Sequence, residues 1–227
     1  MTTLRTVVAA SGGLDSTVLA YDLARNGHEV TLLSFDYGQR HRRELHAARR
    51  LAHRLGARHS VVDLNPLKTV LRGSALTDPD IAVPSGEYTT ETLRTTVVPA
   101  RNAIFLSVAI GAAVSWNAQT VAFAGHSGDH EVYPDCRPAF VRAVQDLART
   151  ATKGFGDVGV LAPYVTWSKS QIVSHGHRLG VPFEATWSCY QGLEWHCGTC
   201  STCRERRGAF ISAQVPDPTE YMETAGA

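Results

Sequence analysis

A glycine-rich loop directly after the first apolar segment restricts the fold of this chain more than any other feature. Residues 10–16 read Ala-Ser-Gly-Gly-Leu-Asp-Ser, and they follow the β-branched run Thr6-Val7-Val8. β-branched residues favour strands, and glycine permits a tight turn from a strand into a helix. The free N–H groups at the start of such a helix, with nearby serine hydroxyls, form an anion site. The pattern predicts a strand–turn–helix unit that binds phosphate, with Asp15 placed to bind Mg²⁺ or to orient a nucleotide.

The following segments alternate between strand-like and helix-like patterns. The expected strands are Thr6–Ala10, Glu29–Phe35, His59–Asp63 and Thr120–Ala124, and the expected helices are Leu14–Arg25, Arg43–Leu55, Arg101–Trp116 and Pro138–Ala151. This alternation predicts an α/β fold with a parallel sheet and right-handed crossovers. Ligands of such sheets bind at the carboxyl ends of the strands, where the Ser11 loop is placed.

The remainder of the chain is less periodic. Leu64–Thr96 contains several prolines and indicates a lid, a binding loop or a disordered segment. Ser168 and Gln171 form a capping box that opens a helix ending at Gly180, and a basic helix is expected from about Arg204 to Ile211. We expect a nucleotide-binding α/β domain over residues 1–165 and a C-terminal helical, metal-binding region over residues 166–227.

Composition excludes some classes of protein. The formal net charge of the 227 residues is +1, so no strong field points to nucleic acid or to a membrane surface. No apolar run approaches the ~18 residues of a membrane span, and residues 1–5 lack the features of a signal peptide. A cytoplasmic location is therefore expected, and disulfides are not.

Four of the five cysteines lie close together in the sequence. Cys189, Cys197, Cys200 and Cys203 have the spacing C-x7-C-x2-C-x2-C, which predicts a structural, four-coordinate Zn²⁺ site. An iron–sulfur cluster is the competing interpretation, and His196 could replace one cysteine. Cys136 stands apart and is more typical of a small buried side chain than of a nucleophile.

Polar segments follow the second and fourth strands. Phe35-Asp-Tyr-Gly-Gln-Arg40 closes the second strand, and positive charge at Arg40–Arg43 favours an anion there, unless the turn is simply solvated. The loop from Gly125 to Arg137 contains Asp129 and Asp135, and it lies where substrate chemistry is expected, unless it is only a hydrated loop.

Two helix starts also carry candidate ligands. Arg101 and Asn102 open an apolar helix and suit phosphate or carboxylate binding, with helix capping by Asn102 as the alternative. Lys169 lies near another helix start, where it could reach a phosphate or remain on the surface.

The Ser11–Ser16 loop is not a Walker A loop, because no Gly-Lys-Ser/Thr follows it. It resembles the PP-loop of ATP pyrophosphatases, which split ATP to AMP and pyrophosphate while adenylating a substrate. Further segments extend the resemblance over nearly the whole chain, to the QueC family of 7-cyano-7-deazaguanine synthases. They are Phe35-Asp-Tyr-Gly-Gln-Arg-His41, Val98-Pro-Ala-Arg-Asn102, Tyr133-Pro-Asp-Cys-Arg137, and Ser188-Cys-Tyr190 with Cys197-Gly-Thr-Cys-Ser-Thr-Cys203.

The resemblance implies a Rossmann-like sheet of the adenine nucleotide alpha hydrolase type, with helices on both faces and a small C-terminal zinc subdomain. It also implies conversion of 7-carboxy-7-deazaguanine and ammonia to the nitrile, with ATP, Mg²⁺ and a structural zinc, in a homodimer. Asp15 would help to place Mg²⁺, Arg101 and Lys169 would neutralise charge, and Asp129 and Asp135 would face the deazapurine and the amine. The expected nucleotide-binding positions are Ala10, Ser11, Gly12, Gly13, Leu14, Asp15, Ser16, Thr17, Phe35, Arg40, Arg101 and Asn102.

Three departures from the family pattern concern the acceptor side of this reaction. Glu131-Val132 precedes Tyr133 where members commonly have Ser-Gly, Ala100 replaces a glycine, and the Gly125–Tyr133 loop is shorter. A related ligase that forms an amide with a different amine, such as one on a protein, is therefore the alternative function. Two other functions fit the sequence less well. A nucleotide-binding module without turnover would leave Asp15 without a role, and an RNA-modifying enzyme would usually have an RNA-binding domain or a basic face.

Overall fold

The centre of the protein is a parallel five-stranded sheet, described here from a computed structural model that covers residues 3–86 and 90–222. The strands lie in the order β3-β2-β1-β4-β5. Their bounds are β1 Arg5–Ala9, β2 Glu29–Asp36, β3 Arg58–Asp63, β4 Thr120–Ala122 and β5 Gly159–Leu161. The order reverses direction at β1, so the carboxyl ends of β1 and β4 flank a crevice of the kind in which parallel sheets bind ligands.

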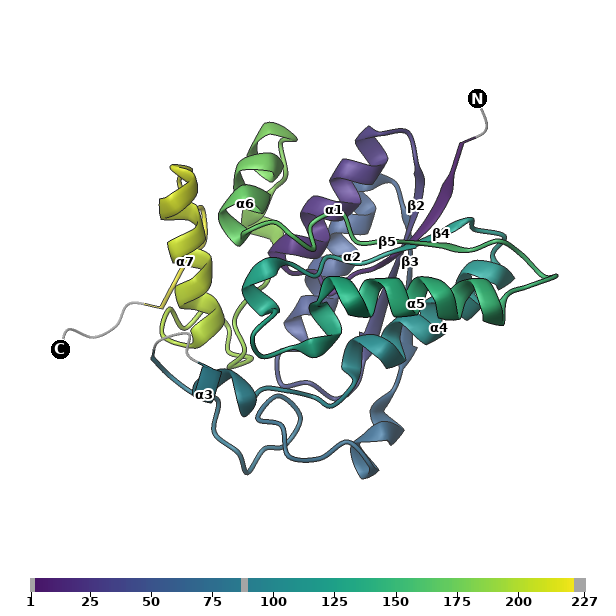
Figure 1. Ribbon diagram of the computed structural model, residues 1–227. Coiled ribbons are helices and arrows are strands. Elements are labelled where there is room, and N and C mark those ends of the chain that lie inside the picture. The colour runs from purple at the N-terminus through teal and green to yellow at the C-terminus, as the bar shows by residue number, and fades with distance from the viewer. Residues whose placement is uncertain (1–2, 87–89, 223–227) are drawn as a thin grey trace.

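Helices cover both faces of this sheet (Figure 1). On one face lie α1 Leu14–Arg25, α2 Arg43–Leu55 and α6 Lys169–Arg178, whose apolar side chains form a core with Val8 and Leu32. On the other lie α4 Arg101–Ser115 and α5 Pro138–Ala151, which pack on Val7, Leu33 and Val121. Alternate residues of β1 thus enter different cores, as the two-residue period of a strand requires.

The sequence prediction of an α/β fold with a parallel sheet is confirmed, and most expected elements lie within a residue or two of their predicted bounds. The capping box is present: the Ser168 hydroxyl accepts from Gln171 N–H, and the Gln171 side chain accepts from Ser168 N–H. The prediction missed β5, because three residues are too few to establish a period. It also began the last helix too late, since α7 spans Ser201–Ala213.

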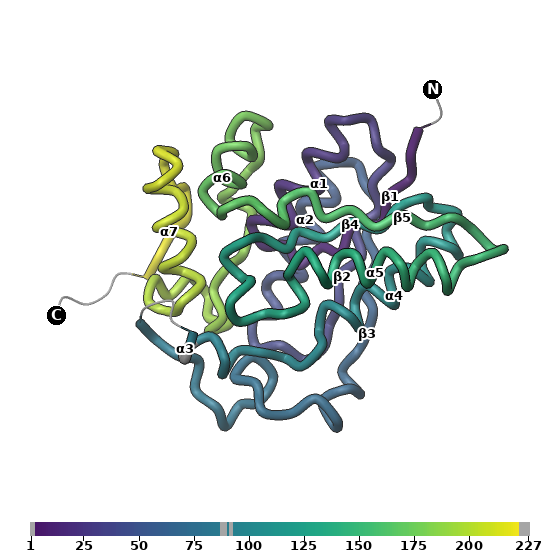
Figure 2. Tube along the Cα trace, viewed as in Figure 1, coloured from purple at the N-terminus to yellow at the C-terminus, as the bar shows by residue number. Residues whose placement is uncertain are grey.

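The long segment after β3 is packed against the protein in its described part. It contains a 3₁₀ turn, Asn65–Thr69, and the short helix α3, Thr90–Arg94, and it buries Ala75 and Leu76 completely. Figure 2 follows this segment around the end of the molecule to α3, near the start of α7. There Gly86 N–H donates to the Thr199 carbonyl, and Ser85 pairs with Cys200. Residues 87–89 of the expected loop lie outside the described residues.

The C-terminal region shares a core with the sheet. Ile172 and Val173 of α6 and Phe210 of α7 belong to the same cluster as Val8 and Val18. The division of the chain at residue 165 stays a prediction. In the described part of the chain, no helix combines the length and the apolarity that a bilayer crossing needs.

Candidate functional site

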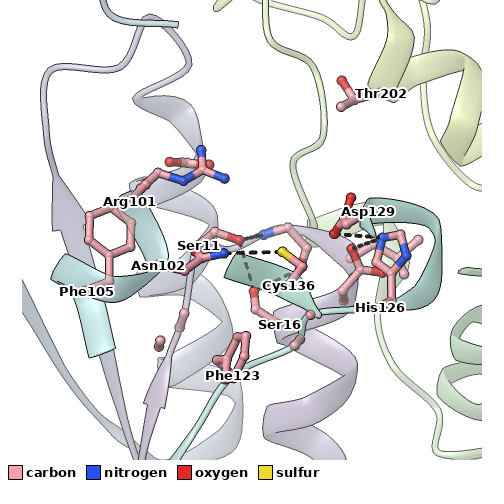
Figure 3. Close-up of a pocket in the computed structure, with 18 of the residues that line it drawn as sticks. Ser11, Ser16, Arg101, Asn102, Phe105, Phe123, His126, Asp129, Cys136 and Thr202 are labelled. Atoms are coloured by element: carbon pink, nitrogen blue, oxygen red, sulfur yellow. Dashed lines mark hydrogen bonds and ion pairs between the residues drawn. The ribbon is translucent and has the colours of Figure 1, made fainter. Parts of the chain in front are cut away.

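A polar pocket opens at the carboxyl ends of β1, β2 and β4. It is lined by backbone and side chains of the Ser11 loop, by Phe35 and Tyr37 at the end of β2, and by residues 123–126 after β4. The start of α4 and part of the C-terminal region complete its walls. Figure 3 shows Arg101 on one side of this pocket, Asp129 and His126 on the other, and Ser11 between them.

The Ser11 loop presents hydrogen-bonding groups at the floor of the pocket. Ser11 Oγ accepts from Gly13 N–H at 3.1 Å and lies 3.1 Å from Ser16 Oγ. Gly13 is the N-cap of α1 and has no side chain to cover the free N–H groups of the first turn. These donors therefore face the pocket, as an anion site requires.

Gly12, one of the expected nucleotide-binding positions, makes its close contact with a neighbouring helix. Its φ of +82° is favoured only by glycine, and a Cβ there would lie 2.2 Å from the Glu44 carbonyl oxygen. Gly12 thus brings the loop against α2, and it is Gly13, with φ of −76°, that lines the pocket. Thr17 also lies outside the lining, where its hydroxyl donates to the Gly13 carbonyl.

A charged cluster forms the wall beside Asp15. Lys169 Nζ lies 3.4 Å from Asp15 Oδ2 and 2.5 Å from Glu205 Oε2. His126 Nε2 lies 3.4 Å from Asp129 Oδ2 and 4.0 Å from Asp15 Oδ2. Burial lowers the pKa of Lys169, but Asp15 and Glu205 outweigh this and hold it well above its ordinary value, so the amine is charged.

The opposite wall combines a charged guanidinium with an uncharged acid–imidazole pair. Arg101 donates to the Tyr37 hydroxyl at 3.2 Å. Burial raises the pKa of Glu44 to about 8 and lowers the pKa of His41 to about 3. The carboxyl group, 3.4 Å from His41 Nε2, is therefore mostly protonated at neutral pH, and the imidazole is neutral.

The Tyr133–Arg137 segment supports the start of α4 rather than pointing into the pocket at every position. Asp135 Oδ2 accepts from Asn102 N–H at 2.9 Å, so this carboxylate caps α4 and does not line the pocket. Asn102 Nδ2 donates to Cys136 Sγ at 3.3 Å. Burial raises the pKa of the Cys136 thiol far above its ordinary value, which agrees with a buried, unreactive thiol.

Arg40 is also held away from the pocket. Its guanidinium donates to the carbonyl oxygens of Asp78 and Ile81, at 2.6 and 2.9 Å, in the segment after β3. Arg42 pairs with Asp36. The protein itself therefore supplies acceptors for the positive charge that we expected to attract an anion.

Four buried cysteines form a compact thiol cluster beside the pocket. The sulfurs of Cys189, Cys197, Cys200 and Cys203 all lie within 4.8 Å of one another, as ligands of one metal ion would. Backbone N–H groups of Thr199 and Cys200 donate to Cys197 Sγ at 3.4 and 3.3 Å. His196 is not part of this cluster, because its Nε2 accepts from Ser188 N–H at 3.1 Å.

Arg206 connects the thiol cluster to the pocket wall. Its guanidinium is 1% exposed and donates to Thr186 Oγ1, the Phe183 carbonyl and Ser188 Oγ. These bonds fix the segment that leads through Trp187, whose backbone N–H donates to the Gly12 carbonyl. The segment that carries the first cysteine of the cluster is therefore tied directly to the Ser11 loop.

The structure brings most of the expected positions together at the pocket, and it adds wall residues that the sequence analysis did not name. Among the expected positions, the pocket is lined by Ala10, Ser11, Gly13, Leu14, Asp15, Ser16, Phe35, Arg101, Asn102, Asp129 and Lys169. The prediction did not include Tyr37, His41, Glu44 or Glu205. A signal existed for Glu205, because it follows Cys203 by two residues. On a helix this spacing directs the two side chains to opposite sides, so Glu205 points away from the cysteines.

Comparison with known proteins agrees with this geometry. A model of the family described as "Queuosine biosynthesis protein QueC" matches residues 5–214. The chain is 53% identical to a 7-cyano-7-deazaguanine synthase of Brucella anthropi over 220 residues, which cover 97% of this chain and 94% of that protein. It is 52% identical to the synthase of Brucella ovis, with the same coverage.

Among solved structures, the fold is similar to that of a U34-tRNA thiolase, NcsA from Methanococcus maripaludis, with its 4Fe-4S cluster. The TM-score is 0.52 at 14% identity, and the match covers 100% of this chain and 77% of that protein. This likeness concerns the fold alone.

Proposed function

Because this chain belongs to the QueC family, we propose that it converts 7-carboxy-7-deazaguanine and ammonia to 7-cyano-7-deazaguanine, with cleavage of ATP to AMP and pyrophosphate. One observation carries this proposal: relatives of that name match 97% of the chain at 53% and 52% identity. The pocket agrees with it, because a phosphate loop at the carboxyl end of β1 lies between two walls that could each hold one substrate.

The residues of the pocket floor would act on the triphosphate. The N–H groups at the start of α1 and the hydroxyls of Ser11 and Ser16 would hold the leaving pyrophosphate. Lys169 and Arg101 would stabilise the negative charge that develops as it leaves. Asp15 is a suitable Mg²⁺ ligand, since its Oδ1 is buried and has no hydrogen-bond partner among the described residues.

The reaction would proceed through two activations. A substrate carboxylate oxygen attacks the α-phosphorus of ATP, and the bond to the β-phosphate breaks. The ammonia nitrogen then attacks the acyl carbon, and AMP leaves with that oxygen, which gives the amide. The amide oxygen attacks a second ATP, and loss of AMP together with the two N–H protons gives the nitrile. Asp129 lies at the wall away from Arg101, and it would accept protons from the amine.

We assign zinc to the thiol cluster. Four sulfurs around one ion at about 2.3 Å stand about 3.8 Å apart, and the mutual limit of 4.8 Å is compatible with that arrangement. A 4Fe-4S cluster would separate them further, because each thiolate binds a different iron. Zinc with four protein ligands has no open coordination position, so it would supply stability rather than chemistry.

The departure at Glu131-Val132 is compatible with nitrile formation. Glu131 is exposed, its carboxylate lies 3.5 Å from Thr90 Oγ1, and neither it nor Val132 lines the pocket. We therefore expect no obstruction of the second activation. A homodimer, which the family resemblance implies, and a cytoplasmic location, which we expect from the sequence composition, stay predictions.

Labelled substrate tests the proposed function. With both carboxylate oxygens of 7-carboxy-7-deazaguanine replaced by ¹⁸O, nitrile synthesis should give two labelled AMP molecules per product, because each activated oxygen leaves on AMP. One labelled AMP with only amide in the mass spectrum would instead support the amide-forming alternative. Formation of ADP and phosphate would refute the PP-loop interpretation altogether.

A further inference from the structure

The Glu205 carboxylate contacts both halves of the charged cluster beside the phosphate loop. Its Oε2 lies 2.5 Å from Lys169 Nζ, and its Oε1 lies 3.9 Å from His126 Nε2. The side chain is 14% exposed and lines the pocket. Glu205 therefore joins α7 to the start of α6 and to the segment after β4.

The metal-ligand segment determines where Glu205 points. Cys200 immediately precedes α7, and Cys203 lies in its first turn. Residues two positions apart on a helix differ by about 200° in direction, from 3.6 residues per turn. With Cys203 facing the thiol cluster, Glu205 faces away from it and into the pocket. Thr202, which also lines the pocket, is drawn above Asp129 in Figure 3.

Lys169 requires such a partner to remain where it is. It is the first residue of α6, and the positive end of the helix dipole disfavours an ammonium there. Asp15 offsets part of this cost at 3.4 Å, but Asp15 is also the group we assign to Mg²⁺. When the triphosphate and its cation occupy the loop, Asp15 would bind the cation. Glu205, the nearer of the two carboxylates, would then remain as the partner of Lys169.

We propose that Glu205 is a positioning residue, which holds Lys169 at the phosphate loop. The thiol cluster, which orients the start of α7, thereby becomes part of the catalytic framework. This inference rests on the proposed function for its kinetic consequence only. An ammonium fixed between two carboxylates needs little reorganisation to meet the charge that develops on pyrophosphate, and such preorganised charge acts mainly in the transition state. Loss of the Glu205 carboxylate should therefore lower kcat more than it raises KM.

Amine acylation tests the contact without turnover. The chain has three lysines, and Lys68 and Lys153 are exposed, so they are internal references for labelling of Lys169 by acetic anhydride. In the metal-loaded protein, Glu205→Gln should raise labelling of Lys169 relative to Lys153 roughly fivefold, because a charge-assisted bond is lost. Unchanged relative labelling in Glu205→Gln would overturn the proposal, whether or not the protein proves to be a synthase.

Steady-state kinetics tests the role in the reaction. Glu205→Gln keeps an acceptor oxygen and should lower kcat for AMP formation roughly tenfold, and Glu205→Ala should lower it further, while KM for ATP changes less than about threefold. Zinc content and the unfolding temperature should stay near those of the wild type. A raised KM with unchanged kcat, or a loss of kcat that tracks lost zinc, would refute positioning. Glu184→Gln is the matched control, since it removes an exposed ion pair with Arg54 and should change neither readout.

Discussion

The buried carboxyl group of Glu44 makes the stability of this protein depend on pH in a direction that can be calculated. Its ordinary pKa of 4.5 rises to about 8 because burial penalises the charged form, and the hydrogen bond from Gln39 offsets this only in part. Ionising Glu44 therefore costs about 5 kcal/mol more in the folded protein than in the unfolded chain, at about 1.4 kcal/mol per pH unit.

The sign follows from where the proton resides. Between pH 4.5 and about 8 the folded state keeps a proton that the unfolded chain has released, so the free energy of unfolding falls as pH rises. His41 acts in the opposite sense, because burial lowers its pKa from 6.5 to about 3 and the unfolded chain alone binds a proton between those values. His41 still adds about 0.4 kcal/mol between pH 6.5 and 8, because its unfolded imidazole is half protonated at pH 6.5. The wild type and a variant of Glu44 share this contribution, so the difference between them isolates Glu44.

Glu44→Gln should abolish this part of the pH dependence. Over pH 6.5–8 the wild type should lose about 1.6 kcal/mol of unfolding free energy through Glu44, and the variant should lose none of it. Urea unfolding of the metal-loaded proteins, followed by tryptophan fluorescence, measures the difference at each pH. Glu29→Gln, at the exposed start of β2, is the control and should follow the wild type. A Glu44→Gln profile parallel to the wild type would refute the assigned burial of the carboxyl group.

Three further predictions concern the framework of the site. Ala100→Gly should raise the free energy of unfolding by about 0.5–1 kcal/mol, because Ala100 has a left-handed φ of 54°, whereas Ala103→Gly within α4 should lower it by a similar amount; equal effects in chemical denaturation would contradict this. Arg206→Ala should cost about 3 kcal/mol, since it leaves buried acceptors and Asp217 without their partner; an unchanged unfolding temperature would exclude the role. Cys200→Ala should lose the metal, measured by elemental analysis, together with much of the stability; a stable, metal-free variant would exclude a structural site.

The sequence determined the features that depend on neighbours within a few positions. The strand–turn–helix unit around Ser11, the capping box at Ser168 and the cysteine spacing each encode their structure locally, because turn geometry, helix capping and metal coordination need residues at short, fixed separations. The alternation of strands and helices then fixed a parallel sheet, and with it the edge where the pocket lies.

Only the tertiary structure decided which side chains face the pocket. Arg40 and Asp135 carry suitable charges, but their acceptor and donor groups lie in distant segments, at Asp78, Ile81 and Asn102, and these contacts direct them to support the walls. Such partners have no fixed sequence separation, so no local pattern reveals them.

The walls of the pocket show the same limit. Lys169 and Glu205 are 36 residues apart, and Glu44 is buried because Gly12 lets the phosphate loop pack against α2. The ionisation of these groups depends on the solvent they lose and on the charges they gain when the elements assemble. The sequence was enough to predict that the Ser11 loop binds phosphate. The packing of α2, α6 and α7 around this loop determined which charged side chains lie beside it.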